Sequence, residues 1–344
     1  MNTQLFWKLL LGFALVNVVM FELFGSSSGL VAKELQYIKF VDSTSLKALH
    51  WVAAYIHRKT PLLADAPYVD PNHDSRLSTW NVNPHQMVVE WLYFTSMFVA
   101  TLAWGKPNTV VPKPTAPFSR KIKIMLYVLF QLSLWTLTAI VYYKFRAWVL
   151  LNEWFAPIYL LQPCHVILGV YVWFIHDLLS TGRITVSHAR IFHVLFDLQW
   201  FTYVALLLPD MDALIERNFF AEYTLFFVEH YLILALPLTL FATIFLEARH
   251  LTWKDRLYRA WYSLTWFGLH HIQVMTPVSL VSGIQINYQT HLPKFVHFQF
   301  GTLYKPIVTS LYFVVILIFA FAVEPMLRTV VRIAKRKLAT KKYI

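Results

Sequence analysis

The side chains that could perform chemistry together are one cysteine and a few histidines within apolar segments. Cys164 is the only cysteine among 344 residues, so an intramolecular disulfide is excluded. Pro163 precedes it, where a proline would bend a membrane helix, and His165 follows it. His230 lies in another apolar segment. A buried cysteine is most often a packing residue. A chemical role for Cys164 therefore depends on whether a histidine lies beside its thiol.

A thiol and a histidine that meet inside a membrane can transfer acyl groups. A thiol with a pKa of about 8.5 is only slightly ionised at neutral pH, and an apolar environment opposes its ionisation. A histidine within hydrogen-bonding distance accepts the proton and stabilises the thiolate. Cys164 would then attack an ester carbonyl and hold the acyl group as a thioester. The same histidine would next deprotonate an incoming hydroxyl group.

The composition is that of an integral membrane protein. Hydrophobic residues make up 58% of the chain and charged residues only 14%, whereas a soluble domain is about half apolar and about a quarter charged. The formal net charge of +12 indicates basic cytoplasmic loops rather than binding of nucleic acid. A single cysteine excludes clusters held by several thiolates, while 14 histidines leave a haem or histidine-ligated metal site open.

The apolar segments predict an all-α fold, a polytopic membrane helical bundle with about eight transmembrane helices, each of about 20 residues. We interpret it as a seven-helix core preceded by an N-terminal anchor. The predicted spans are Leu5–Phe24, Met87–Trp104, Ile122–Tyr143, Ile158–His176, His188–Leu208, Tyr223–Leu246, Tyr258–Ser282 and Leu303–Val323.

Three regions follow from these spans. Residues 1–86 form the anchor and a long polar region, in which residues 30–59 are predicted to be an amphipathic luminal segment. Residues 87–325 form the membrane catalytic bundle, and residues 326–344 form a basic cytoplasmic tail. Since the short loops on one side carry most of the Lys and Arg residues, both termini are predicted to be cytoplasmic.

The last four residues predict a cellular location. The chain ends in Lys341-Lys342-Tyr343-Ile344. Two lysines at these positions of a cytoplasmic C-terminus resemble a di-lysine retrieval signal, which a coat complex reads and which does not anchor the chain. We therefore expect a multi-pass protein of the endoplasmic reticulum membrane.

The predicted topology brings the cysteine and several histidines to a similar depth. At 1.5 Å per residue, Cys164 lies about 10 Å, His230 about 12 Å, and His270 with His271 about 16 to 18 Å from the luminal face. Ionisable groups at such depth normally face protein or water and mark function. His230 is the expected base because it is closest in depth. The adjacent Glu229 points about 100° away on the helix, which makes it a poor direct orienter.

Other polar residues could orient the reacting groups or bind substrate, and the sequence does not select among them. A histidine such as His165 more often makes an interfacial or satisfied polar contact than a catalytic one. The candidates are His165, His270, His271, Asn287 and Asp197, with Gln199 as a further candidate for an oxyanion hole.

Four motifs resemble the transmembrane protein 164 family in order and spacing. They are Leu160–His165, Val228–His230, His270 and Val281–Asn287, and the resemblance covers roughly residues 87 to 344. The family pattern has Asn at the position of Gln162 and Gln at the position of Glu229, so both departures are next to the key residues and not at them.

This resemblance implies an acyltransferase of the endoplasmic reticulum. Such proteins move a polyunsaturated acyl chain from a phospholipid donor, typically phosphatidylcholine, to a lyso-ether phosphatidylethanolamine without acyl-CoA. The catalytic cysteine and histidine of the family fall on Cys164 and His230. The fold it implies is a small membrane bundle similar to that of intramembrane lipid hydrolases. No cofactor and no metal are expected, and the expected partners are the donor phospholipid and the lysophospholipid acceptor.

Two other classes of protein would use the same polar positions. A channel, transporter or lipid scramblase would line a pathway with them, although few acidic residues and the lack of an internal repeat disfavour this class. A haem or metal protein would ligate its group through His230 and either His270 or His271, as facing helices of a bundle can do. The acyltransferase remains the leading hypothesis.

Overall fold

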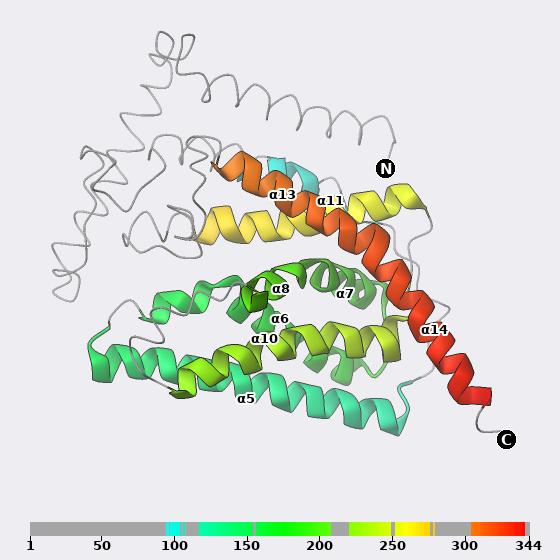
Figure 1. The fold of residues 1–344 in the computed structure, drawn as a ribbon, viewed down its shortest axis with the longest axis horizontal. Helices are drawn as coiled ribbons and strands as arrows, with labels where there is room; N and C mark the ends of the chain where they lie inside the picture. The colour runs from blue at the N-terminus through cyan, green and yellow to red at the C-terminus, as the bar shows by residue number, and fades with distance from the viewer. Residues whose placement is uncertain are drawn as a thin grey trace, which may run out of the picture. The chain divides into compact units, whose positions relative to one another are not determined.

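The structure, a computed structural model, describes part of the chain, and every regular element in that part is a helix (Figure 1). The expected all-α class is therefore confirmed. The chain divides into two compact units. Unit 1 comprises Met1–Trp104 and Thr265–Tyr312, and unit 2 comprises Gly105–Leu264 and Phe313–Ile344. The described residues are 94–95, 97–103, 105, 107, 117–153, 156–207, 220–248, 252–275, 278 and 304–340.

Four of the described helices are long and apolar enough to cross a membrane, which supports a multi-pass protein. They overlap the third, fourth, sixth and eighth predicted spans, with different bounds. These helices are Arg120–Leu151, Pro163–Thr181, Phe220–Phe245 and Thr309–Lys337. The second predicted span is helical where it is described, at residues 94–95 and 97–103. The first predicted span, the amphipathic segment 30–59, Asn287, Lys341 and Lys342 lie outside the described residues.

The fifth and seventh predicted spans differ from single apolar helices. The fifth consists of α7, Val186–Leu198, and α8, Trp200–Leu207, which meet at Gln199. Each is shorter than the length of about 20 residues that a spanning helix needs. The seventh corresponds to α11, Trp253–Leu269, and η5, His270–Met275, with charged residues in its first turns. The described ranges thus contain four helices of membrane-spanning length, whereas eight spans were predicted for the whole chain.

Helix α5, Arg120–Leu151, is longer than the span predicted for it. Ser119 caps its start by accepting a hydrogen bond from the backbone N–H of Ile122, and Asn152 ends it in the left-handed conformation at φ 57°. Its 32 residues correspond to about 48 Å. Because the hydrocarbon core is about 30 Å thick, the ends of α5 extend beyond it.

The segment before Cys164 is not the start of a continuous helix. Residues Ala156–Leu161 form the 3₁₀ helix η3, and α6 runs from Pro163 to Thr181. Pro163 is the first residue of α6, where its missing N–H costs no hydrogen bond and its fixed φ suits the helix. The expectation that this proline bends a helix is therefore wrong. Pro163 starts the helix and places Cys164 in its first turn.

The start of α7 is tied to the end of α6. The Thr185 hydroxyl accepts from the His188 backbone N–H, and His188 Nδ1 accepts in return from the Thr185 backbone N–H, both at 3.1 Å. Nε2 of the same imidazole therefore carries the proton and donates to Asp177 at 2.7 Å. This reciprocal cap fixes the turn between the two helices.

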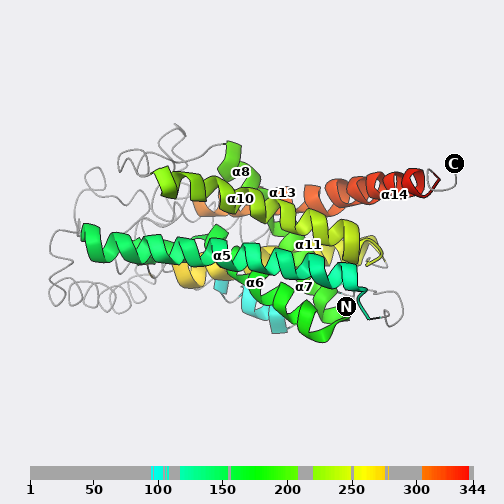
Figure 2. The same cartoon turned by 90° about the horizontal axis from the view of Figure 1, so that it is seen from below.

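Helix α10, Phe220–Leu240, lies at the centre of unit 2. It packs against α5, α6, α7 and α8, and it lies beside α5 in both views (Figures 1 and 2). Pro237 lies inside it, and the π-helix η4, Phe241–Phe245, continues it. The rings of Phe192 and Phe245 stack at 4.2 Å between centroids, which anchors α7 to η4. This packing holds the helix that carries Glu229 and His230.

Unit 1 has its own small core. Phe94 and Phe98 stack with centroids 5.9 Å apart and pack against Ile272. Gly268 allows this close approach, since a Cβ there would lie 2.2 Å from the Phe98 ring.

The C-terminal helices are α13, Tyr304–Ile318, η7, Phe319–Val323, and α14, Glu324–Thr340.

Candidate catalytic site

The predicted nucleophile and base come from two helices of unit 2 that pack together. Cys164 and His165 lie in the first turn of α6, and Glu229 and His230 follow each other in α10. All four side chains are buried. The first turn of a helix has unpaired backbone N–H groups and a partial positive charge, so it favours a thiolate. The packing of α6 on α10 therefore brings these four residues to one place in unit 2.

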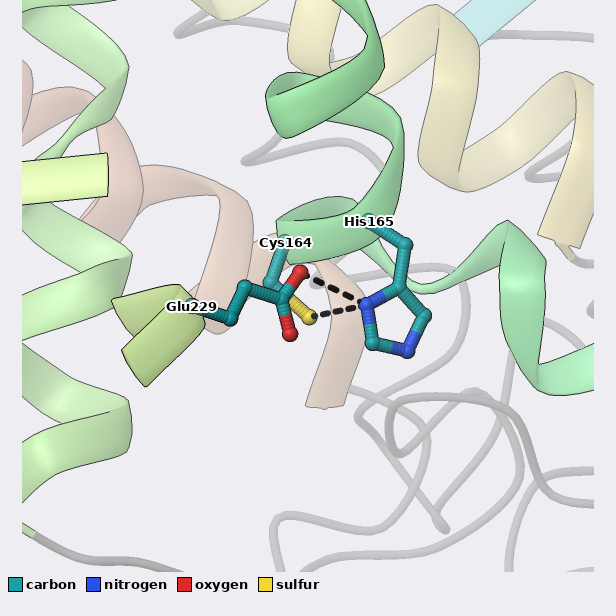
Figure 3. Close-up of side chains that lie close together, drawn as sticks. All are labelled: Cys164, His165 and Glu229. Carbon is teal, nitrogen blue, oxygen red and sulfur yellow. Dashed lines mark hydrogen bonds and ion pairs between the residues drawn. The ribbon is translucent and has the colours of Figure 1, made fainter. Parts of the chain in front are cut away.

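Nδ1 of His165 faces both the Cys164 thiol and the Glu229 carboxylate. This nitrogen is 2.7 Å from Glu229 Oε1 and 3.6 Å from the Cys164 sulfur (Figure 3). An ionised carboxylate only accepts hydrogen bonds, so at 2.7 Å Nδ1 carries the proton and donates it to Glu229. Nδ1 therefore has no free lone pair with which to take the thiol proton.

His230 is held in a different way. Its Nδ1 lies 2.7 Å from the backbone carbonyl oxygen of Phe226, one turn earlier in α10. A carbonyl oxygen can only accept, so Nδ1 is protonated and Nε2 of the neutral ring has a free lone pair. The imidazole of His230 also interacts with the Cys164 thiol. His230 is thus the histidine whose tautomer suits it to accept the proton of Cys164.

The hydrogen bonds distinguish the two histidines near Cys164. Both are close to the sulfur, but only His230 has an acceptor nitrogen left for it. In His165 the nitrogen nearest the sulfur is the one that donates to Glu229. The base role that the sequence predicts for His230 is therefore consistent with the hydrogen bonds of both rings.

Glu229 is the residue of this site that the sequence reasoning underestimated. Its hydrogen-bonding partner is His165 on α6 and not the neighbouring His230. The angle of about 100° between adjacent residues turns Glu229 away from His230 on α10. That angle says nothing about a partner on another helix. The signal was available in two adjacent pairs, Cys164-His165 and Glu229-His230, on helices of similar depth. Only the packing of α6 on α10 shows that His165 of the first pair meets Glu229 of the second.

Two other candidate histidines belong to unit 1. His270 and His271 begin the π-helix η5. The His271 ring is buried and lies 4.4 Å from the Phe267 ring and 6.2 Å from the Tyr312 ring, measured between centroids. These contacts place His271 in the aromatic packing of its own unit.

Asp197 takes part in a buried ionic network. No described contact joins it to Cys164. Arg259 donates through Nε to Asp197 at 2.7 Å and also donates to Glu324. The Ser263 hydroxyl donates to Asp197 at 3.0 Å, and Arg328 donates to Glu324 at 2.6 Å. The network joins α7, α11 and α14. Its partners indicate a structural role for Asp197, because its carboxylate oxygens are occupied by Arg259 and Ser263.

Gln199, the other candidate for an oxyanion hole, lies at the junction of α7 and α8. Its side chain is buried, and neither its amide nitrogen nor its amide oxygen has a hydrogen-bond partner among the described residues. The backbone oxygen of Gln199 accepts from Thr202 N–H at 3.0 Å, which shapes the turn between the helices. No described contact joins Gln199 to Cys164.

Three of the site residues are also potential metal donors. The sulfur of Cys164, a ring nitrogen of His165 and a carboxylate oxygen of Glu229 lie within 4.8 Å of one another, and zinc accepts all three donor types. Yet the nitrogen that faces the carboxylate carries the proton of the 2.7 Å hydrogen bond. A metal ion bound by all three donors would have to replace that proton.

Comparison with known proteins finds a relative in the family that the sequence motifs resemble. The transmembrane protein 164 homolog of Dictyostelium discoideum is 29% identical over 153 residues, which are 44% of this chain and 50% of that protein. The chain therefore spans half the length of the curated relative that it matches. No family model matches the chain, and no solved structure matches it. The alignment confirms the resemblance, and the chain is a membrane protein similar to the transmembrane protein 164 family.

Proposed function

We propose that this protein is a phospholipid acyltransferase or transacylase that works without acyl-CoA. The observation that carries the proposal is the buried Cys164 thiol, which interacts with the imidazole of His230 while Phe226 holds the other nitrogen of that ring. This pairing of a nucleophile with an oriented base is the one that covalent acyl transfer requires. The resemblance to the transmembrane protein 164 family supports a lipid substrate.

The reaction begins at an ester of a membrane phospholipid. His230 Nε2 takes the Cys164 proton, and the sulfur attacks the ester carbonyl. His230 then returns the proton to the departing lysophospholipid oxygen, which leaves the acyl group on Cys164 as a thioester. In the second half, the hydroxyl group of a lysophospholipid attacks the thioester and carries the acyl chain away.

The resemblance extends the proposal to substrates and location. By that resemblance, the transferred chain is polyunsaturated, the donor is typically phosphatidylcholine and the acceptor is a lyso-ether phospholipid. The protein acts in the endoplasmic reticulum membrane with its C-terminus in the cytoplasm, where a coat complex would read Lys341 and Lys342.

The proposal is tested by labelling the acyl-enzyme. Membranes that contain the protein are incubated with a phospholipid labelled in its acyl chain, and the label on Cys164 and on added lysophospholipid is measured. Cys164→Ala should abolish both signals, and His230→Ala should slow acylation by about 10²-fold or more, since a general base contributes that much. His176→Ala is the matched control, because His176 is an exposed histidine on the same helix. Transfer that persists in Cys164→Ala membranes would refute the assignment.

A further inference from the structure

Helix α14 continues a membrane-spanning segment and ends in basic residues. The chain carries no charged residue over residues 306–323, a run of about 27 Å at 1.5 Å per residue, which nearly fills the hydrocarbon core of about 30 Å. In α14, every charged residue after Glu324 is a cation, and the last three are the exposed Lys335, Arg336 and Lys337. These three residues are called the basic end. Both views show α14 extending past the end of α10 (Figures 1 and 2).

One face of α14 is held against the end of α10. Arg328 donates to the backbone oxygen of Ala248 at 2.8 Å, and Arg332 donates to Glu247 at 2.7 Å. The guanidinium of Arg328 also lies over the Phe241 ring, 5.2 Å from its centroid. Because residues four apart lie on the same side of a helix, Arg328 and Arg332 define one docked face of α14.

The opposite face of α14 is apolar and exposed. Met326, Val330 and Ile333 are 59%, 55% and 49% exposed, and their spacing of four and three residues forms a stripe along the helix. At 100° per residue, this apolar stripe lies about 140–200° around the helix from Arg328. Lys337 follows Ile333 by one turn and continues the same line. The face is thus apolar along most of its length and cationic at its tip, which complements a phospholipid with an anionic headgroup.

The contact between Arg332 and Glu247 shows the depth of the basic end. Glu247 is the first charged residue after the uncharged residues 231–246 of the α10 segment, so it marks the point where that segment leaves the hydrocarbon core. Lys335 and Lys337 follow Arg332 by three and five residues, which is at most about 4.5 and 7.5 Å along the axis. The headgroup layer on each side of a bilayer is about 5–7.5 Å thick. The basic end therefore lies at the level of the lipid phosphates.

We propose that this end of α14 is a binding surface for anionic phospholipids of the membrane around the protein. Their acyl chains lie along the apolar stripe, and their headgroups pair with the basic end. Charge complementarity selects this occupant. The two carboxylates that contact α14 or belong to it, Glu247 and Glu324, are both engaged by arginines, and the cations of α14 outnumber them. A zwitterionic lipid has no net charge to offer such a surface, whereas phosphatidylserine does. The proposal does not depend on acyl transfer.

Lipid-specific fluorescence quenching tests this surface. Ala334→Cys, an exposed position between the stripe and the basic end, carries the fluorophore, and the native Cys164 is buried. The full-length protein is placed in phosphatidylcholine nanodiscs with a trace of nitroxide-labelled phosphatidylserine or nitroxide-labelled phosphatidylcholine. The apparent affinity should be about five-fold or more higher for phosphatidylserine, since one Lys or Arg near a membrane surface contributes about that factor. The preference should shrink at high salt.

Two triple variants separate a local site from overall charge. Neutralising the basic end with Lys335→Gln, Arg336→Gln and Lys337→Gln should make the two lipids quench equally. The matched control removes three exposed cations from other elements on the same predicted side of the membrane, and it should keep the preference. These control substitutions are Lys121→Gln, Arg183→Gln and Lys254→Gln.

The apolar stripe is tested by Val330→Ser together with Ile333→Ser. This variant should reduce quenching by both lipids, because the acyl chains lose their contact surface. Equal quenching of the labelled parent protein by both lipids would show a merely solvated basic tail and would overturn the proposal. A preference that the dispersed control also loses would overturn it as well, and so would unchanged quenching in the serine variant.

Discussion

At the residue scale, the site depends on which nitrogen of each imidazole carries the proton. The backbone carbonyl of Phe226 can only accept, so it holds His230 in the tautomer that has a free Nε2. The carboxylate of Glu229 does the same for His165. Two side chains of the same type thus present lone pairs to different places, and each can accept a different proton.

Removal of metal ions is expected to leave acyl transfer unchanged. The reason is that the Nδ1 nitrogen of His165, one of the three grouped donors, carries a proton to Glu229 and does not offer a lone pair. The measurement is transfer to lysophospholipid before and after treatment with EDTA, together with the metal content of the purified protein. A loss of activity on chelation that zinc restores would contradict the hydrogen-bonded arrangement.

At the element scale, helix starts and helix crossings place the reacting groups. Pro163 begins α6 and so sets Cys164 in its first turn, while α10 brings Glu229 and His230 to the same level. A second set of polar contacts ties α7, α11 and α14 together through Arg259. The first set serves chemistry in our proposal, and the second holds the helices of unit 2 in register.

Replacing Arg259 with methionine is expected to destabilise the fold by about 3–5 kcal/mol, because it leaves the Asp197 carboxylate buried without its counter-charge. The double variant Asp197→Leu, Arg259→Met should recover part of this loss, since a buried pair can be replaced by apolar residues at little cost. Chemical unfolding in mixed micelles measures both. Arg332→Met is the matched control, because its pair with Glu247 is largely exposed. Equal stability of Arg259→Met and the control would show that the network contributes little.

The contact between Glu247 and α14 predicts a dependence of stability on pH. The hydrogen bond from Arg332, at 2.7 Å, lowers the pKa of Glu247 below its ordinary value. Its contribution is therefore complete above the unfolded-state pKa of about 4.3 and is lost as the pH falls through the lower folded-state pKa. Since the pair is exposed, the effect should be at most about 1 kcal/mol. Thermal unfolding of Glu247→Gln should show a weaker loss of stability below pH 4 to 5 than the wild type. Parallel curves would exclude this contact as a cause.

At the scale of the whole molecule, all four residues of the candidate site lie in unit 2, which combines residues 105–264 with the C-terminal segment from Phe313. Four described helices are able to cross a membrane. The distribution of Lys and Arg predicts that α5 starts on the cytoplasmic side and ends on the luminal side. The two ends of α5 therefore report the orientation of the bundle.

Single cysteines at the two ends of α5 should be labelled from opposite sides of the membrane. Both Lys121 and Leu151 are exposed, and the native Cys164 is buried, so it gives little background. In sealed microsomes, a membrane-impermeant maleimide should label Lys121→Cys directly. It should label Leu151→Cys only after the membrane is permeabilised. The reverse pattern would invert the predicted topology.

The linear chain was enough to identify a membrane protein, a lone thiol and a histidine at its depth, because apolar length and helical rise are local properties. It did not reveal that Glu229 meets His165, that Asp197 is paired with Arg259, or that the fifth predicted span breaks at Gln199. These features depend on the rotation of each helix about its axis and on its neighbours. A repeating apolar pattern leaves both open, since a helix that is apolar on every side has no preferred face.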